Sequence, residues 1–160
     1  MDYSSIFSPN RIGRSDMVEK GKSITLGLEF EKQNLSNEKI LGLNIGNIFK
    51  DKKNKALPNK SKLDQTRSDI VGDIFYKFDD KFELNYNFSY DRDLDFSNYD
   101  AVSAKFGFNK VITTFDYITE NHELGNSEIL KNNTQIVLNK DHSLKFGTTK
   151  DLKDDFTQFY

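Results

Sequence analysis

The sequence predicts an all-β fold: a segment of an antiparallel transmembrane β-barrel, about eight or nine strands joined as a meander of hairpins and forming an incomplete barrel. Three observations lead to this prediction. Apolar and polar side chains alternate along successive segments, short and long connections alternate between those segments, and most segments are about ten residues long. The 160 residues are interpreted as one unit, with a lead-in loop over 1–22 and antiparallel strands over 23–160.

Alternation is clearest in residues 82–92. A strand turns successive side chains to opposite faces, so this segment has one apolar side and one polar side. The side predicted to face lipid consists of Phe82, Leu84, Tyr86, Phe88 and Tyr90. The polar side, together with the matching side of 98–109, is predicted to face the barrel lumen and includes Glu83, Asn85, Asn87, Ser103 and Lys105.

The other strands follow the same pattern with more exceptions. Asn47 interrupts an apolar side, Val71 and Phe75 interrupt a polar side, and the sides of 111–120 are ambiguous. The last residues, 156–160, read as a strand cut short. The remaining predicted strands are 23–31, 40–49, 68–78, 98–109, 111–120, 129–139 and 143–149.

Connections of two lengths are expected to alternate. The short ones contain Asn or Asp, as hairpin turns require, and lie at 79–81, 109–110 and 139–142. The longer ones lie at 50–67, 92–97, 121–128 and 150–155, with 33–39 intermediate. Outer-membrane barrels have short periplasmic turns and long extracellular loops. This pattern places the turn at 79–81 on the periplasmic side.

Composition excludes several other classes. Only 36% of residues are hydrophobic, yet the chain has 14 Phe and 7 Tyr, which argues against disorder. A net charge of -2 gives no support for nucleic-acid binding, and without cysteine no disulfide or thiol chemistry is possible. No apolar run reaches the roughly 18 residues of a transmembrane helix. No signal peptide is recognisable, so we expect a mature or internal piece of something larger.

Four stretches, in this order along the chain, resemble the family of LPS-assembly outer-membrane proteins (LptD). They are 10–21 (NRIGRSDMVEKG), 43–49 (LNIGNIF), 68–72 (SDIVG) and 90–95 (YDRDLD). The resemblance covers most of the chain and corresponds to the later part of the family's barrel.

The resemblance implies a role in inserting lipopolysaccharide into the outer leaflet of the bacterial outer membrane. It further implies lipopolysaccharide, the outer-membrane lipid bilayer, a plug lipoprotein and periplasmic bridge components as partners. The periplasmic jellyroll, the first barrel strands, the disulfide cysteines and the closing strand of that family have no counterpart here, so we do not expect the chain to transport anything by itself.

A lysine-rich loop offers a candidate contact for lipopolysaccharide phosphates, because a lysine ammonium is a reasonable phosphate partner. A solvated loop is the simpler interpretation, since runs of charge are usually that. The lysines are Lys50, Lys52, Lys53, Lys55, Lys60 and Lys62.

Other candidate sites are weaker. Asp91, Asp93 and Asp95 have the spacing of the start of a calcium loop, but neither its glycine nor its final Glu follows. His122 and His142 have no nucleophile nearby in the sequence. We therefore predict no catalytic residue, no enzyme activity, no cofactor and no metal site.

Two alternatives stay open, and a third lacks support. The chain could be a small autonomous outer-membrane barrel with a structural or adhesive role, since its strand number is near the minimum for closure. It could be a soluble β-barrel that binds a ligand. An outer-membrane hydrolase would need a Ser–His pair on one strand face, which the sequence does not supply.

Overall fold

The computed structural model describes residues 2–8, 21–55, 57, 62–122 and 125–160. It contains one short helix, α1 (Tyr3–Ile6), and nine strands. The strands are β1 (Ser23–Gln33), β2 (Lys39–Lys50), β3 (Ile70–Asp79), β4 (Phe82–Tyr90), β5 (Ser97–Phe108), β6 (Val111–His122), β7 (Gly125–Val137), β8 (Ser143–Asp151) and β9 (Phe156–Phe159). No helix among the described residues is long and apolar enough to cross a membrane.

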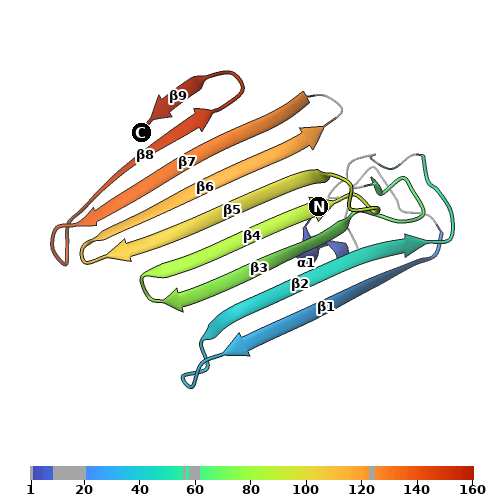
Figure 1. Ribbon diagram of the computed structural model, residues 1–160, viewed down its shortest axis with the longest axis horizontal. Helices are drawn as coiled ribbons and strands as arrows, with labels where there is room; N and C mark the ends of the chain where they lie inside the picture. The colour runs from blue at the N-terminus through green and yellow to red at the C-terminus, as the bar shows by residue number, and fades with distance from the viewer. Residues whose placement is uncertain (1, 9–20, 56, 58–61, 123–124) are drawn as a thin grey trace.

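The strands form a single sheet in chain order, β1 to β9 (Figure 1). Every neighbouring pair is antiparallel, so each strand pairs with the one before it and the one after it. β1 and β9 lie at opposite edges, and the sheet is not closed into a barrel. The predicted all-β meander of eight or nine antiparallel strands is therefore confirmed, as one open sheet.

One prediction about the connections is wrong. The link expected over 121–128 is only two residues long, because β6 runs to His122 and β7 begins at Gly125. The last link, between β8 and β9, has four residues, whereas the loop between β2 and β3 has nineteen. Polar residues such as Asn126 and Glu128, which suggested a loop, pair in the ladder with Asn121 and Thr119. Backbone pairing tolerates polar side chains where a face is not buried in a core.

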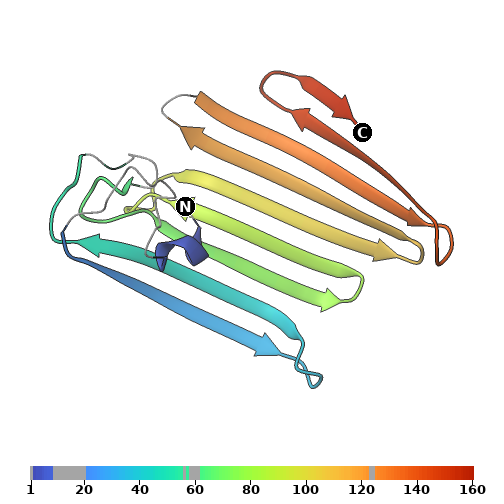
Figure 2. The same ribbon diagram turned by 180° about the vertical axis from the view of Figure 1, so that it is seen from behind.

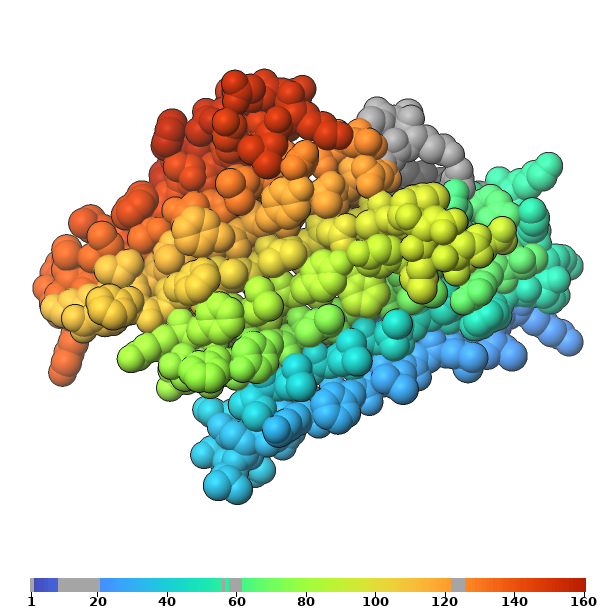
Figure 3. All heavy atoms as spheres, viewed as in Figure 1, coloured from blue at the N-terminus to red at the C-terminus, as the bar shows by residue number. Residues whose placement is uncertain are grey.

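The register defines two faces of the sheet. We call the face that carries α1 the inner face and the opposite one the outer face (Figures 2 and 3). Phe82, Phe106 and Phe115 make a run of ring contacts across β4, β5 and β6 on the outer face, with ring centroids 5.3 and 6.3 Å apart. This contact settles the ambiguous strand β6, whose Phe115 lies outward while Ile112 and Ile118 lie inward.

The outer face of β1 to β5 is nearly continuous apolar surface. Several of its side chains are more than half exposed, as befits a surface with no protein layer over it. Its members on β1, β2 and β3 are Ile24, Leu26, Leu28, Phe30, Leu41, Leu43, Ile45, Phe49, Ile70, Ile74 and Tyr76.

The buried apolar core lies on the inner face and at one end only. It consists of Tyr3, Ile6, Ile48, Leu57, Leu63 and Val71. These residues come from α1, from the loop between β2 and β3, and from β2 and β3 themselves. Val71 interrupted the predicted polar side because it contributes to this core rather than to a wet surface.

Candidate functional site

Helix α1 and the loop over 51–69 fold back onto the inner face, and we call these two elements the inner cap. α1 rests where Gly27 and Gly46 face each other across β1 and β2. A Cβ atom on Gly46 would collide with the Ile6 side chain, and one on Gly27 would collide with Phe7. The absence of side chains at these two positions therefore allows the helix to approach the sheet.

Polar contacts hold α1 in this position on the sheet. The Tyr3 hydroxyl donates to Glu29 Oε1 at 3.0 Å, and the Thr25 hydroxyl donates to the Ile6 carbonyl at 3.4 Å. Burial and the Glu29 carboxylate raise the pKa of Tyr3 to about 12, so its hydroxyl remains a donor at neutral pH. Asp2 caps the helix by accepting from the Ser5 amide at 2.8 Å.

The loop of the inner cap is attached to the C-terminal end of β2 by hydrogen bonds. The Ser68 amide donates to the Ile48 carbonyl and the Ile48 amide donates to Ser68 Oγ, both at 3.0 Å. The Lys50 ammonium donates to the Leu63 carbonyl at 2.5 Å. Some described residues of the loop are thus hydrogen-bonded to β2 rather than purely solvated.

Asn47, the polar exception on the apolar side of β2, holds the point where β2 and β3 separate. Its side-chain amide donates to the carbonyls of Ser68 and Asp69 at 2.8 and 3.0 Å. The ladder between the two strands ends at the pair Gly46 and Val71. Asn47 therefore satisfies backbone acceptors that ladder bonds would otherwise use. A single Asn in an apolar row was the available sequence signal.

Asp69 is a fully buried carboxyl group beneath the loop. Its Oδ2 accepts from Asn98 Nδ2 at 2.8 Å and from Ser89 Oγ at 3.4 Å, while Oδ1 has no hydrogen-bond partner among the described residues. Burial raises the pKa of Asp69, and the nearby Asp91 acts in the same direction while the Lys62 ammonium opposes it. These contacts join Asp69 to β4 and β5. The sequence pattern placed Asp69 on a polar side expected to line the lumen, and its burial was not expected.

The lysines of the candidate phosphate contact have different surroundings where the structure describes them. Lys50 is occupied by the Leu63 carbonyl, and Lys62 is half-buried near Asp69. Lys52, Lys53 and Lys55 are exposed and available to a ligand, and Lys60 lies outside the described residues. The first resembling stretch, 10–21, also lies almost entirely outside them.

The two predicted faces of β4 and β5 are separate in the structure. Glu83 faces Lys105, Asn85 faces Ser103, and Asn87 lies in the same inner row. The predicted lipid-facing residues form the outer row, where Phe88 contacts Tyr86 and Tyr90 with ring centroids 5.5 and 5.8 Å apart. The outer row also contains Asp100, which accepts from the Tyr86 hydroxyl at 2.5 Å.

The aspartates of the suspected calcium loop stabilise a turn. Asp91 Oδ1 accepts from the amides of Asp95 and Phe96 at 2.8 and 3.4 Å, and Asp93 pairs with Arg92 at 3.1 Å. Among the described residues, no group of three or more His, Cys, Asp or Glu is arranged to hold a metal ion. His142 hydrogen-bonds to Asn139 within its own turn.

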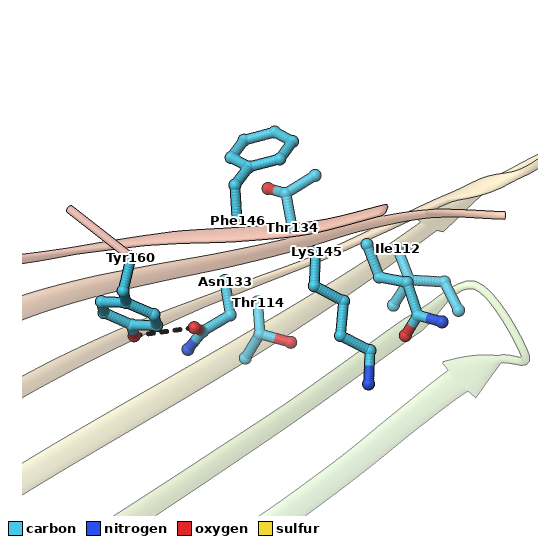
Figure 4. Close-up of a pocket in the computed structure, with 8 residues that line it drawn as sticks. Ile112, Thr114, Asn133, Thr134, Lys145, Phe146 and Tyr160 are labelled. Atoms are coloured by element: carbon cyan, nitrogen blue, oxygen red, sulfur yellow. Dashed lines mark hydrogen bonds between the residues drawn. The ribbon is translucent and has the colours of Figure 1, made fainter. Parts of the chain in front are cut away.

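A second feature of the inner face escaped the sequence analysis. The inner face of β6, β7 and β8 carries a hollow of about 440 Å³, which Tyr160 borders (Figure 4). Lys145, Gln135 and Asn133 line it. Gly147, which lies under the Tyr160 ring, was the only sequence signal that something packs there.

Comparisons with known proteins identify the family of the chain. No curated protein matches the sequence. The model of the family described as LPS transport system D (LptD) matches residues 1–146, which is most of the chain. The chain therefore belongs to the LptD family, with a role in lipopolysaccharide transport.

Proposed function

We propose that the chain forms part of the wall of an outer-membrane β-barrel that inserts lipopolysaccharide into the outer leaflet. The outer face contacts lipid, and the inner face lines the conduit. The observation that carries this proposal is the separation of faces in one open sheet: apolar rows cover the outer face of β1 to β5, whereas the inner row of β4 is polar. Family membership supplies the cargo.

The strand lengths support a membrane-spanning role. β3 has 10 residues and β5 has 12. Ten to twelve residues at about 3.3 Å each give roughly 33–40 Å, and a tilt of about 45° reduces this to about 23–28 Å, close to the thickness of the apolar band of such barrels. Only closed or continued strands satisfy backbone groups within lipid, so the edges β1 and β9 need further strands beside them.

The proposed partners are those that membership of the family implies. Lipopolysaccharide and the bilayer contact the two faces, and the plug lipoprotein and periplasmic bridge components of the transport machinery complete the assembly. The role is that of a conduit rather than an enzyme. Lys52, Lys53 and Lys55 at the long-loop end would meet lipopolysaccharide phosphates as they emerge.

Spin labels on neighbouring residues test the placement of the two faces. The chain has no cysteine, so Val102→Cys and Ser103→Cys each give a unique label on the outer and inner face of β5. In a bilayer, the label at 102 should relax faster with oxygen and the label at 103 with a water-soluble nickel complex. Equal accessibility of both labels to the nickel complex would contradict the proposal.

Photocrosslinking in cells tests the cargo. A photoreactive residue at Ser103 should form an adduct with lipopolysaccharide, detected on immunoblots, in the full-length protein that contains this chain. The same residue at Asn139, in an exposed turn, serves as the control. An adduct at 139 but none at 103 would show that the inner face is not the conduit.

A further inference from the structure

The hollow at the far end of the inner face has the size and opening of a ligand site. Its volume of about 440 Å³ lies within the usual range for small-molecule pockets, about 300–1,000 Å³. In Figure 4, Thr114, Asn133, Lys145 and Tyr160 project to one side of the strands, and Thr134 and Phe146 project to the other. The hollow therefore belongs to the inner face.

Tyr160 forms one wall of the hollow and is fixed from two directions. Its backbone continues the β9 ladder, with amide-to-carbonyl distances to Gly147 of 2.7 and 3.0 Å. Its hydroxyl donates to Asn133 Oδ1 at 2.8 Å. A Cβ atom on Gly147 would lie 2.6 Å from Tyr160 Cε2, so glycine leaves the space that the ring occupies. The Tyr160 ring is therefore held in position beside the polar groups of the hollow.

Three polar side chains of the hollow have no partner among the described residues. Within the described part of the chain, the Lys145 ammonium, the Gln135 amide and the Thr114 hydroxyl make no side-chain hydrogen bond or ion pair. The register explains the free ammonium, because Lys145 faces Gln135, and Gln135 faces Ile112 on the next strand. None of these neighbours carries a negative charge.

Other inner-face lysines differ from Lys145 in this respect. Lys105 faces Glu83 on β4, and Lys131 faces Asp116 on β6. Each of those lysines has a carboxylate at the directly opposed position, which lowers its attraction for an external anion. Lys145 is therefore the inner-face lysine best suited to bind a phosphate.

We propose that this hollow binds a phosphorylated sugar. Lys145 would hold the phosphate, Gln135 and Thr114 would hydrogen-bond to sugar hydroxyls, and the Tyr160 ring would cover one face of the sugar. The proposal rests on the proposed function in one respect, that the inner face is the one exposed to passing lipopolysaccharide. It adds a specific place along the wall where the saccharide part of that cargo binds.

Calorimetry on the full-length protein that contains this chain, purified in detergent micelles, tests the site, with a phosphorylated glucosamine disaccharide as the probe. Wild type should bind it saturably, and Lys145→Gln should weaken binding at least about tenfold. Lys145→Arg, which keeps the charge, should retain most of the affinity and shows that the position tolerates substitution. The matched control is Lys140→Gln, an exposed lysine in the turn between β7 and β8, which should bind like wild type.

Two further titrations identify what is recognised. The same disaccharide without phosphate should bind at least about tenfold more weakly, and inorganic phosphate alone should also bind weakly. Equal binding of inorganic phosphate, equal losses in Lys145→Gln and Lys140→Gln, or no saturable binding by wild type would each overturn the proposal. If the photocrosslink at Ser103 persists in any of those cases, the hollow is refuted while the conduit function stands.

Discussion

Two regions of the sheet differ in what covers their faces. The first region consists of strands β2 and β3, and the second consists of strands β6 to β8. The inner face of the first region is covered by the inner cap, and the buried apolar side chains of the described residues lie in these two layers. The inner face of the second region is open and hollowed. The outer faces differ too. The first is apolar, but the second contains Thr113, Asn132 and Thr134.

These outer polar groups satisfy one another. Asn132 Nδ2 donates to Thr113 Oγ1 at 2.9 Å and to the Thr114 carbonyl at 3.2 Å, and the hydroxyls of Thr113 and Thr134 lie 2.8 Å apart. Unpaired polar groups are costly in hydrocarbon, so a paired cluster can lie on a lipid-facing surface where single polar side chains could not. An outer face can therefore be compatible with lipid in two ways: through apolar side chains, or through polar side chains that hydrogen-bond to one another.

The largest effect is expected from removing a core side chain of the first region. Ile48→Ala should lower the free energy of unfolding by about 3 kcal/mol, because Ile48 is completely buried beneath the inner cap. Ile112→Ala, on the open inner face of the second region, should cost less than about 1 kcal/mol, since that side chain is 37% exposed. Urea unfolding in detergent measures both, and equal losses would remove the distinction between the regions.

A smaller effect is expected from the outer polar cluster. Asn132→Ala should destabilise the chain by about 1 kcal/mol, because it leaves the Thr114 carbonyl and Thr113 hydroxyl without their donor. A double-mutant cycle with Thr113→Val should give a coupling energy of about 0.6 kcal/mol. Asn85→Ala is the control and should cost little, because the Asn85 side chain donates to Glu83 on the polar inner face. Additive losses at 113 and 132 would show that the cluster is not cooperative.

Asp69 should make the first region sensitive to pH. Its pKa is raised in the folded chain, so the native state binds more protons than the unfolded state just above the ordinary value of 3.8. Stability should therefore fall as pH rises from about that value through the native pKa, and Asp69→Asn should remove this decline.

Asp80 supplies the opposite sign as a control. Its hydrogen bond and ion pair with Lys77 lower its pKa, so its contribution is present above pH 3.8 and is lost as pH falls. Asp80→Asn should remove a small gain of stability with pH. Unfolding curves between pH 3 and 8 would contradict this account if both variants changed the pH profile in the same direction.

The smallest effect on stability is expected from the exposed lysines of the inner cap. Changing Lys52, Lys53 and Lys55 together to Gln should leave the free energy of unfolding within about 0.5 kcal/mol of wild type. It should nevertheless weaken binding to lipopolysaccharide vesicles. The matched triple variant changes Lys32, Lys81 and Lys140, exposed lysines of the short-turn end. Equal binding losses in the two variants would indicate a non-specific charge effect.

Most strand boundaries were predictable because period-two alternation is a local property. β4 begins at the predicted residue, and β5 and β8 differ from their predicted bounds by at most two residues at either end. The start of β7 was missed by four residues because Asn126 and Glu128 resemble loop residues. A polar side chain in a strand that faces water or a lumen carries no penalty, so polarity alone did not mark the end of the strand.

The candidate sites were less predictable because they depend on contacts between distant segments. In the sequence, Asn47 is only a polar exception on an apolar side of a strand. Its role depends on the Ser68 and Asp69 carbonyls, which lie about twenty residues later in the chain. Likewise, nothing about Lys145 in sequence distinguishes it from Lys131; only the register shows that one faces Gln135 and the other Asp116.

The sequence by itself determined the strands, their order and the two faces, because side-chain parity and short hairpin connections are set within a few residues. Only the tertiary structure decided which loop folds inward, where the core lies and which lysine is left without a counter-charge. These features arise from packing and pairing between segments far apart in the chain, such as Tyr3 and Val71, which belong to the same core. Local alternation carries no information about such contacts.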